Sequence, residues 1–193
     1  MKIALASNNA KKLSELQAML PPSYELQDIG AYDSPEETGT TFVENAIIKA
    51  RYVASLSKLP TIADDSGLEV DYLNGQPGIY SSRFAGAGAN DNDNNQKLLE
   101  ALKGVSSELR SARFRCVIVY LRHAQDPMPI IATGTWEGQI LEFARGGNGF
   151  GYDPLFFIPD LKKSSAELDA TEKNKKSHRA LALLNLHDLL GKM

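Results

Sequence analysis

Apolar residues along this chain recur with two alternating periods, one typical of strands and one typical of helices. The apolar run at residues 2–6 predicts a buried strand. Leucines three and four residues apart over 13–20 predict a helix, which the two following prolines end. Thr41 and Glu44 have the spacing of a capping box, in which each residue satisfies a backbone N–H of the other. They predict a helix that runs from there to about residue 57.

The rest of the chain continues this alternation and then turns to strands. In order, the pattern predicts strands at 24–29 and 59–63, a mostly irregular segment at 74–95, a helix at 94–102, strands at 112–121, 130–134 and 136–141, a glycine-rich turn at 146–151, a polar loop and a helix at 178–190. Helices alternating with strands, joined to an antiparallel section, indicate a mixed-sheet α/β protein. At 193 residues we expect one domain over 1–193.

Composition narrows the function classes. Hydrophobic residues make up 42% of the chain and charged residues 23%, which is ordinary for a globular protein with a full core. The net charge of −3 gives no general attraction to nucleic acid or acidic membranes. The single cysteine, Cys116, excludes a disulfide framework and fits a reducing, cytoplasmic setting. We expect no signal peptide, and no apolar run approaches the roughly 20 residues that span a membrane.

An adjacent pair of carboxylates, Asp64 and Asp65, is the first candidate for chemistry. The pair follows the predicted strand at 59–63, so we expect it at a strand's carboxyl end, where ligands bind in open α/β sheets. Adjacent like charges disfavour each other's ionisation, so a buried pair needs protonation, a cationic partner or a metal. A solvated turn between strands is the simpler interpretation of the pair by itself.

The polar turn Ser7–Lys12, between the first strand and the first helix, is a candidate anion site. Backbone N–H groups at a helix N-terminus bind anions, and Lys11 and Lys12 lie where the helix dipole favours acids. A phosphate held between amides and lysine would remove this conflict, whereas a solvated N-terminus with surface lysines needs no ligand. The chain lacks the sequence GxxxxGK[ST], which excludes a P-loop.

Acidic residues also precede the helix that starts near Thr41. Glu36 or Glu37 can join Asp64 and Asp65 in a cluster of oxygen ligands suited to Mg²⁺, and no histidine or thiol cluster is suited to zinc. The helix dipole favours acids at this position without any metal, so both interpretations stay open.

Two segments of the last third combine glycine, aromatic and basic residues. In Asn148–Pro154, glycines permit tight turns and close approach of a ligand, and Phe150 or Tyr152 can stack on a base or plug the core. In Glu172–Arg179, basic residues lie around the predicted start of the last helix, where they attract an anion or simply form a solvated face.

Together these segments resemble the inosine triphosphate pyrophosphatase family, the Ham1-like non-canonical purine nucleoside triphosphatases. The matching stretches run in family order over essentially the whole chain: SNNAKK from Ser7, EETGTTFVENAIIKA from Glu36, ADDSGLEVDYLNGQPGIYSSRFAG from Ala63, RFRC ending at Cys116, GFGYDPLF from Gly149 and EKNKKSHRALA from Glu172. Two departures are visible. Asp169 lies where a hydroxyl residue is expected, and the asparagine-rich segment 89–95, which could alter a lid or a dimer contact, is not a family signature.

The resemblance implies hydrolysis of a nucleoside triphosphate between its α and β phosphorus atoms, which gives the monophosphate and pyrophosphate. The implied substrates are ITP, dITP and XTP, so the activity would remove deaminated purines from the nucleotide pool. Asp65 is the implied catalytic base and a ligand of Mg²⁺, with Glu36, Glu37 and Asp64 as the other candidate metal ligands. The implied substrate-binding residues are Ser7, Asn8, Asn9, Ala10, Lys11, Lys12, Lys49, Ser66, Phe150, Gly151, Tyr152, Asp153, Lys173, His178 and Arg179.

The resemblance also implies an architecture and partners. We expect two α/β lobes around a long central sheet, with the active-site cleft between the lobes. The implied protein is a cytoplasmic homodimer that acts on a small-molecule substrate, and neither nucleic acid nor a membrane is an expected partner.

Two other functions are compatible with parts of this pattern. The Maf-like nucleotide pyrophosphatases have a similar architecture but act on other nucleotides, so rapid ITP hydrolysis with little UTP or dTTP hydrolysis would exclude them. A non-catalytic module that binds RNA or nucleotide through the basic residues would release no pyrophosphate. The carboxylates argue against such a module, because acids repel a polyanion unless a metal intervenes.

Overall fold

A computed structural model describes the backbone of residues 1–7, 10–20, 22–27 and 29–191, and the side chains of the same residues except 10–13. The chain divides into two compact units. Met1–Ser66, Cys116–Gly134 and His178–Met193 form the first unit, and Gly67–Arg115 and Thr135–Ser177 form the second. None of the helices in the described ranges combines the length and the apolar character needed to cross a lipid bilayer.

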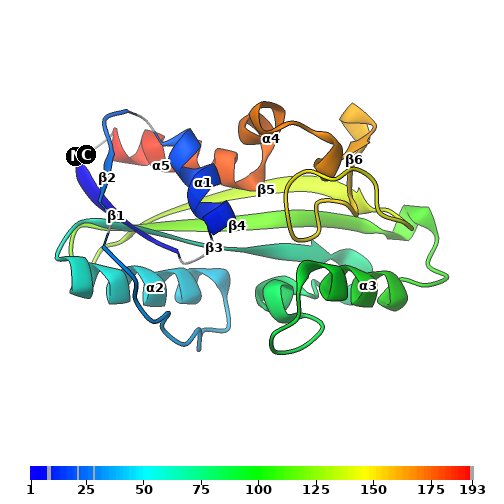
Figure 1. Ribbon diagram of the computed structural model, residues 1–193, viewed down its shortest axis with the longest axis horizontal. Helices are drawn as coiled ribbons and strands as arrows, with labels where there is room; N and C mark the ends of the chain where they lie inside the picture. Colours follow the sequence, from blue (N-terminus) through cyan, green and yellow to red (C-terminus); the bar gives the residue numbers. More distant parts are fainter. Residues whose placement is uncertain (8–9, 21, 28, 192–193) are drawn as a thin grey trace. The chain divides into compact units, whose positions relative to one another are not determined.

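The described residues build a mixed α/β protein with strands and helices (Figure 1). They form one seven-stranded sheet in the order β2-β1-β3-β4-β5-β6-β7. Its strands are β1 (Lys2–Ala6), β2 (Glu25–Gln27), β3 (Thr61–Val70), β4 (Ser111–Leu121), β5 (Ile130–Ile140), β6 (Phe156–Ile158) and β7 (Lys163–Ser164). The α-helices are α1 (Ala10–Met19), α2 (Phe42–Ser57), α3 (Asp91–Ala101), α4 (Ala170–Lys176) and α5 (His178–Leu190). The predicted fold class is therefore confirmed.

The first unit has a parallel section of the sheet with helices on both faces. β1 pairs in parallel with β2 and β3, with Ala4 opposite Thr61 and Ala6 opposite Ala63. Parallel strands of this kind are buried on both faces, which explains the nearly continuous apolar run in β1. Helices α1 and α5 pack on one face of these strands in a core that includes Ile62, and α2 packs on the other in a core that includes Ala63.

The second unit contains antiparallel strands around an aromatic core. β6 pairs with β5 and with β7, and Phe157 lies opposite both Gln139 and Ser164. The Phe156 ring on β6 lies in tilted contact with Phe114 and Trp136, at centroid distances of 4.5 and 5.4 Å. These contacts, at the separations that aromatic pairs prefer, fix the strands that carry the last third of the chain.

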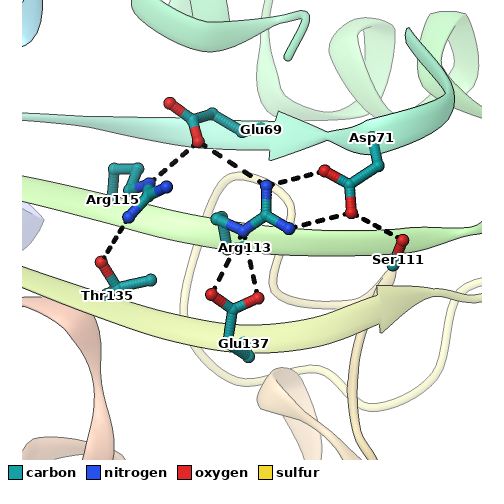
Figure 2. A network of polar contacts seen from close by, with 7 residues as sticks. All are labelled: Glu69, Asp71, Ser111, Arg113, Arg115, Thr135 and Glu137. Carbon is teal, nitrogen blue, oxygen red and sulfur yellow. Dashed lines mark hydrogen bonds and ion pairs between the residues drawn. The ribbon is translucent and has the colours of Figure 1, made fainter. Parts of the chain in front are cut away.

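A network of ion pairs links three neighbouring strands of the second unit (Figure 2). Arg113 on β4 donates to Asp71 at 2.7 and 2.9 Å and to Glu137 on β5 at 3.1 Å. Arg115 donates to Glu69 on β3 at 2.9 Å. The hydrogen bonds from Arg113 hold the pKa of Asp71 below its ordinary value. The carboxylates of this network are thus neutralised by guanidinium groups, which gives the network a structural role.

Two strands are longer than the sequence pattern predicts. β3 does not end before the carboxylate pair but continues to Val70, and β5 is one strand where two were predicted on either side of Gly134. A Cβ atom on Gly134 would lie 2.1 Å from the carbonyl oxygen of His178. Gly134 is therefore required by the close approach of α5 to the strand, and the prediction of a break there was wrong.

Two helices were also misplaced by the sequence pattern. α3 begins at Asp91, three residues before the predicted start, because Asn90 accepts the N–H of Asp93 in a capping box. α4 lies where a polar loop was predicted, and Asp169 caps it by accepting the N–H of Glu172 at 2.8 Å. The departure at Asp169 is thus conservative, since aspartate and the hydroxyl residues are both good N-caps.

We expect Asp126→Ala to lower the free energy of unfolding by about 2 kcal/mol at pH 7, because the buried carboxylate accepts charge-assisted hydrogen bonds. Arg122 donates to it through its backbone N–H at 3.0 Å and its Nε at 2.8 Å, and the Met128 N–H donates at 3.0 Å. Urea unfolding measures the loss, and Asp33→Ala, at an exposed aspartate of the same unit, is the control.

The same substitution gives a pH dependence. Hydrogen bonds from Arg122 hold the pKa of Asp126 far below its ordinary value of 3.8. A lowered carboxylate pKa stabilises the folded state fully above the ordinary pKa, and this contribution is lost as pH falls below it. The difference between wild type and Asp126→Ala should thus be constant from pH 7 to about 5 and shrink below about pH 4. A difference that grows with acid would contradict this assignment.

Candidate active site

The two adjacent carboxylates lie inside a strand, and this separates them. Asp64 and Asp65 are residues four and five of β3, with exposed fractions of 2% and 6%. Successive side chains of a strand point to opposite faces. Asp64 therefore lies on the α1 and α5 side together with Ile62, and Asp65 lies on the α2 side together with Ala63. The expectation that the pair lies at a strand's carboxyl end was wrong, and so was the simpler interpretation of a solvated turn.

On the α2 side, Asp65 is paired with a lysine. Lys49 Nζ lies 2.7 Å from Asp65 Oδ1 and 3.2 Å from Glu37 Oε1. Burial by itself lowers the pKa of Lys49, but the negative charges of Asp65, Asp64 and Glu37 outweigh burial and raise it. Lys49 is therefore a permanent cation at neutral pH, in direct contact with the implied catalytic base.

The loop before α2 is held by short-range hydrogen bonds, and this brings Glu37 to Lys49. The Gly39 N–H donates to Asn45 Oδ1 at 2.9 Å, and a Cβ on Gly39 would lie 2.6 Å from the Cβ of Glu44. Glu44 also accepts the N–H of Thr41 at 2.9 Å, which completes the predicted capping box. This local signal was readable from the sequence, because every partner lies within six residues of the others.

On the opposite face of β3, Arg179 of α5 collects three polar partners. Its guanidinium donates to Glu15 Oε2 at 2.9 Å, to Ser66 Oγ at 2.9 Å and to Asp64 Oδ2 at 3.5 Å. Arg179 is 3% exposed. Sequence reasoning missed Glu15, because nothing local distinguishes it from any other acid on an amphipathic helix. Only the packing of α1 beside α5 brings it to Arg179.

The remaining predicted residues of the first unit are placed as follows. Ser7 is half-buried, Glu36 is exposed and His178 is buried. Asn8 and Asn9 lie outside the described residues, as do the side chains of Ala10, Lys11 and Lys12, so the predicted triphosphate turn stays a prediction.

A second cluster of predicted residues forms in the second unit around Asp153. Lys173 Nζ lies 2.7 Å from Asp153 Oδ2, and the Phe150 N–H donates to the same oxygen at 2.9 Å. Ser165 Oγ donates to Asp153 Oδ1 at 2.8 Å. Asp153 and Lys173 are 2% and 5% exposed. The sequence indicated Asp153 and Lys173 but not Ser165, which is brought close by the turn after β7.

The two aromatic residues of the glycine-rich loop have different roles. Tyr152 is 4% exposed in the core of the second unit, and its hydroxyl donates to the Ser81 carbonyl at 2.8 Å. Burial raises the pKa of Tyr152, so the hydroxyl keeps its proton. Phe150 is only half-buried, with Lys173 Nζ 5.0 Å from its ring centroid. Of the two alternatives left open by the sequence, Tyr152 is the core plug and Phe150 remains the candidate for stacking.

The donor chemistry of the Asp65 side fits a hard divalent cation. Asp65 and Glu37 converge on one positive charge, that of Lys49. Mg²⁺ binds proteins through one or two carboxylates together with water and substrate phosphates, so a cage of protein ligands is not needed. Among the described residues, no three His, Cys, Asp or Glu side chains gather as a closed metal site. Glu37, rather than the exposed Glu36, is the glutamate that the structure brings to this cluster.

The sequence profile of the Ham1 family matches residues 3–189, nearly the whole of the chain described above. This chain belongs to the Ham1 family. The family resemblance inferred from the motifs is thereby confirmed.

Similar proteins agree with this membership over full length. The chain is 56% identical to the dITP/XTP pyrophosphatase of Pseudomonas aeruginosa over 192 residues, which are 98% of this chain and 97% of the relative. It is 54% identical to the dITP/XTP pyrophosphatase of Vibrio cholerae, over 96% and 94% of the two chains. The solved structure of a HAM1 protein from Coxiella burnetii matches with a TM-score of 0.91 at 47% identity over 100% of both chains. The Staphylococcus aureus Ham1 protein matches with a TM-score of 0.87 at 41% identity, over 100% and 99%.

We expect Lys49→Met to lower the free energy of unfolding by about 3 kcal/mol at pH 7, because it leaves the buried carboxylate of Asp65 without its cation. The raised pKa of Lys49 sets the pH window. A raised lysine pKa stabilises the folded state fully below the ordinary value of 10.5, and this contribution is lost as pH rises above it. The deficit of the variant should therefore shrink only above about pH 10.

Chemical unfolding at pH 7 to 11 measures both effects. Lys103→Met is the matched control, because Lys103 pairs with Glu100 at 3.2 Å on the surface, where such pairs contribute little. Equal losses in the two variants would show that Lys49 is not a buried cation.

Proposed function

We propose that this protein hydrolyses the non-canonical purine nucleoside triphosphates ITP, dITP and XTP to the monophosphate and pyrophosphate. The observation that carries the proposal is the pairing of Asp65 with Lys49 in a chain whose full-length relatives are named dITP/XTP pyrophosphatases. We further propose that the chain acts as a single domain over 1–193 and as a cytoplasmic homodimer, both carried over from the family resemblance.

Cleavage of a phosphoanhydride requires mainly alignment and neutralisation of charge. In this proposal Asp65 orients the attacking water and accepts its proton as general base. Lys49 contacts Asp65, which supports its proposed role of neutralising phosphate oxygens, and the turn Ser7–Lys12 is proposed to hold the rest of the triphosphate. Mg²⁺ bound at Asp65 and Glu37 would supply further neutralisation of phosphate charge.

Arg179 and Asp64 form the support for this arrangement on the other face of β3. The guanidinium is engaged by Glu15, Ser66 and Asp64, so in this structure its donors serve the protein. Asp64 therefore contributes supporting charge, while Asp65 performs the chemistry.

Base selection follows from hydrogen-bond polarity. Hypoxanthine and xanthine carry a keto oxygen at C6, which accepts a hydrogen bond, whereas adenine carries an amino donor there. A site with donors at this position, such as His178 or a backbone N–H, leaves them unpaired with adenine. Such sites reject the wrong group by factors on the order of 10⁴. Guanine shares the keto group, so its exclusion depends on the 2-amino position.

A substrate panel tests the activity. We expect pyrophosphate release from ITP, dITP and XTP in the presence of Mg²⁺, at rates at least about 100-fold above those for ATP, UTP and dTTP. Chelation of the metal with EDTA should abolish turnover, because the phosphate charge is then only partly neutralised. Release of inorganic phosphate instead of pyrophosphate would contradict cleavage between the α and β phosphorus atoms. Preference for UTP or dTTP would favour a Maf-like activity.

Removal of the proposed base gives a second test. We expect Asp65→Asn to lower kcat for ITP by at least about 100-fold while nucleotide binding persists, because the amide keeps the shape and the acceptor oxygen but cannot take a proton. Single-turnover kinetics with calorimetric binding of inosine monophosphate separates the two effects.

Asp160→Asn provides the matched control, since Asp160 is an exposed aspartate of the second unit. It should retain wild-type kcat and KM. If Asp65→Asn keeps most of its kcat, Asp65 is not the base.

A further inference from the structure

Helix α3 holds both backbone polar groups of one residue in the glycine-rich loop, Gly151. The Gly151 N–H donates to Asp91 Oδ2 at 2.8 Å, and Asn95 Nδ2 donates to the Gly151 carbonyl at 2.9 Å. Asp91 and Asn95 are four residues apart and therefore lie on one face of the helix. Both come from the asparagine-rich segment 89–95, which carries none of the motifs behind the family resemblance.

The clamping helix is itself fixed by its first turn. The capping box of Asn90 and Asp93 sets where α3 begins. Asn94, which is 4% exposed, accepts the N–H of Ala85 at 2.8 Å and donates to the Ser82 carbonyl at 3.1 Å. These bonds set the rotation of the helix about its axis, so the Asp91 and Asn95 side chains face Gly151 from a rigid element.

Gly151 lies between the two aromatic residues of the loop, Phe150 and Tyr152. Gly151 has a φ of +62°, a conformation that glycine adopts at little cost. Its N–H belongs to the peptide that follows Phe150, and its carbonyl belongs to the peptide that precedes Tyr152. Asp153 holds the Phe150 N–H from the interior, at 2.9 Å. The backbone on both sides of the Phe150 ring is thus fixed, by Asp153 on one side and by α3 on the other.

We propose that Asp91 and Asn95 are positioning residues that hold Phe150 in place for the nucleotide base through the backbone N–H and carbonyl of Gly151. The inference rests on the proposed function, and it takes the half-buried Phe150 as the residue that stacks on the nucleotide base. Neither residue contacts the nucleotide. The Gly151 N–H is bonded to Asp91, so Gly151 contributes by its backbone conformation.

Loss of these hydrogen bonds should affect KM and the Kd of the nucleotide more than kcat. Loss of one hydrogen bond that orders a binding loop corresponds to about a fivefold weaker affinity. We expect Asp91→Ala and Asn95→Ala each to raise KM for ITP about fivefold and the double variant about 20-fold, with kcat changed less than about twofold. The Kd of inosine monophosphate, measured by calorimetry, should rise in parallel.

The conservative variant separates positioning from a general effect of charge or helix stability. Asp91→Asn retains an acceptor oxygen for the Gly151 N–H and should keep KM near the wild-type value. Asn92→Ala, on the same helix turn at an exposed position, is the matched control and should change neither parameter. Melting temperatures of all variants show whether any fails to fold.

Two results would overturn the proposal. One is an unchanged KM in folded Asp91→Ala and Asn95→Ala, and the other is equal KM values for Asp91→Asn and Asp91→Ala. If the wild type neither hydrolyses ITP nor binds inosine monophosphate, the proposed function fails instead. Amide exchange of residues 149–153 then tests the clamp by itself: faster exchange in the double variant than in Asn92→Ala supports the ordering of the loop, and equal exchange contradicts it.

Discussion

The alternation of side chains along β3 is the constraint on which the candidate active site depends. Because successive strand residues face opposite sides, the adjacent carboxylates Asp64 and Asp65 enter different layers of the first unit. Each meets its own cation there, Arg179 from α5 and Lys49 from α2. Two like charges that would repel each other in a turn are thus separated, and each is paired with a different cation. The same alternation gives them different surroundings, and the proposed function assigns catalysis to Asp65 beside Lys49 and supporting charge to Asp64 beside Arg179.

Short-range hydrogen bonds at the helix starts fix the positions of the adjacent loops. The capping boxes at Thr41, Asn90 and Asp169 each define where a helix begins, and each stands next to a candidate functional segment. The first precedes the helix that carries Lys49, which contacts Glu37 in the loop before it. The second begins α3, whose residue Asp91 contacts Gly151. The third starts α4, whose buried lysine meets Asp153. Polar residues of a kind that is common in loops thus act as N-caps that fix the segments carrying the candidate site residues.

In the second unit, too, a buried carboxylate is neutralised by a cation, since Asp153 pairs with Lys173. Burying one charge alone would be costly, so each stabilises the other, and Ser165 and the Phe150 N–H satisfy the remaining acceptor positions of the carboxylate. The glycine-rich loop is consequently held from inside by an ion pair, while the aromatic roles divide between a buried Tyr152 and a half-buried Phe150. A loop tied in this way can present a ring to a planar ligand without the entropy cost of ordering it at each binding event.

The sequence by itself determined the mixed α/β class, the position of most elements, the family and the residue types of the site, because helical and strand periods and capping signals act within a few residues. It also indicated candidate site residues, among them Lys49, Asp65, Asp153 and Lys173. Only the tertiary structure decided that β3 runs on through the carboxylates, since acids are tolerated in a buried strand only where cations from distant helices meet them. It alone decided that Glu15 joins Arg179, that Glu37 rather than Glu36 joins Lys49, and that an asparagine-rich helix start grips Gly151. Glu15 lies far from Arg179 in the chain, and α3 lies far from Gly151, so no local pattern indicates these contacts, whereas the choice of Glu37 depends on how the loop before α2 folds back toward Lys49.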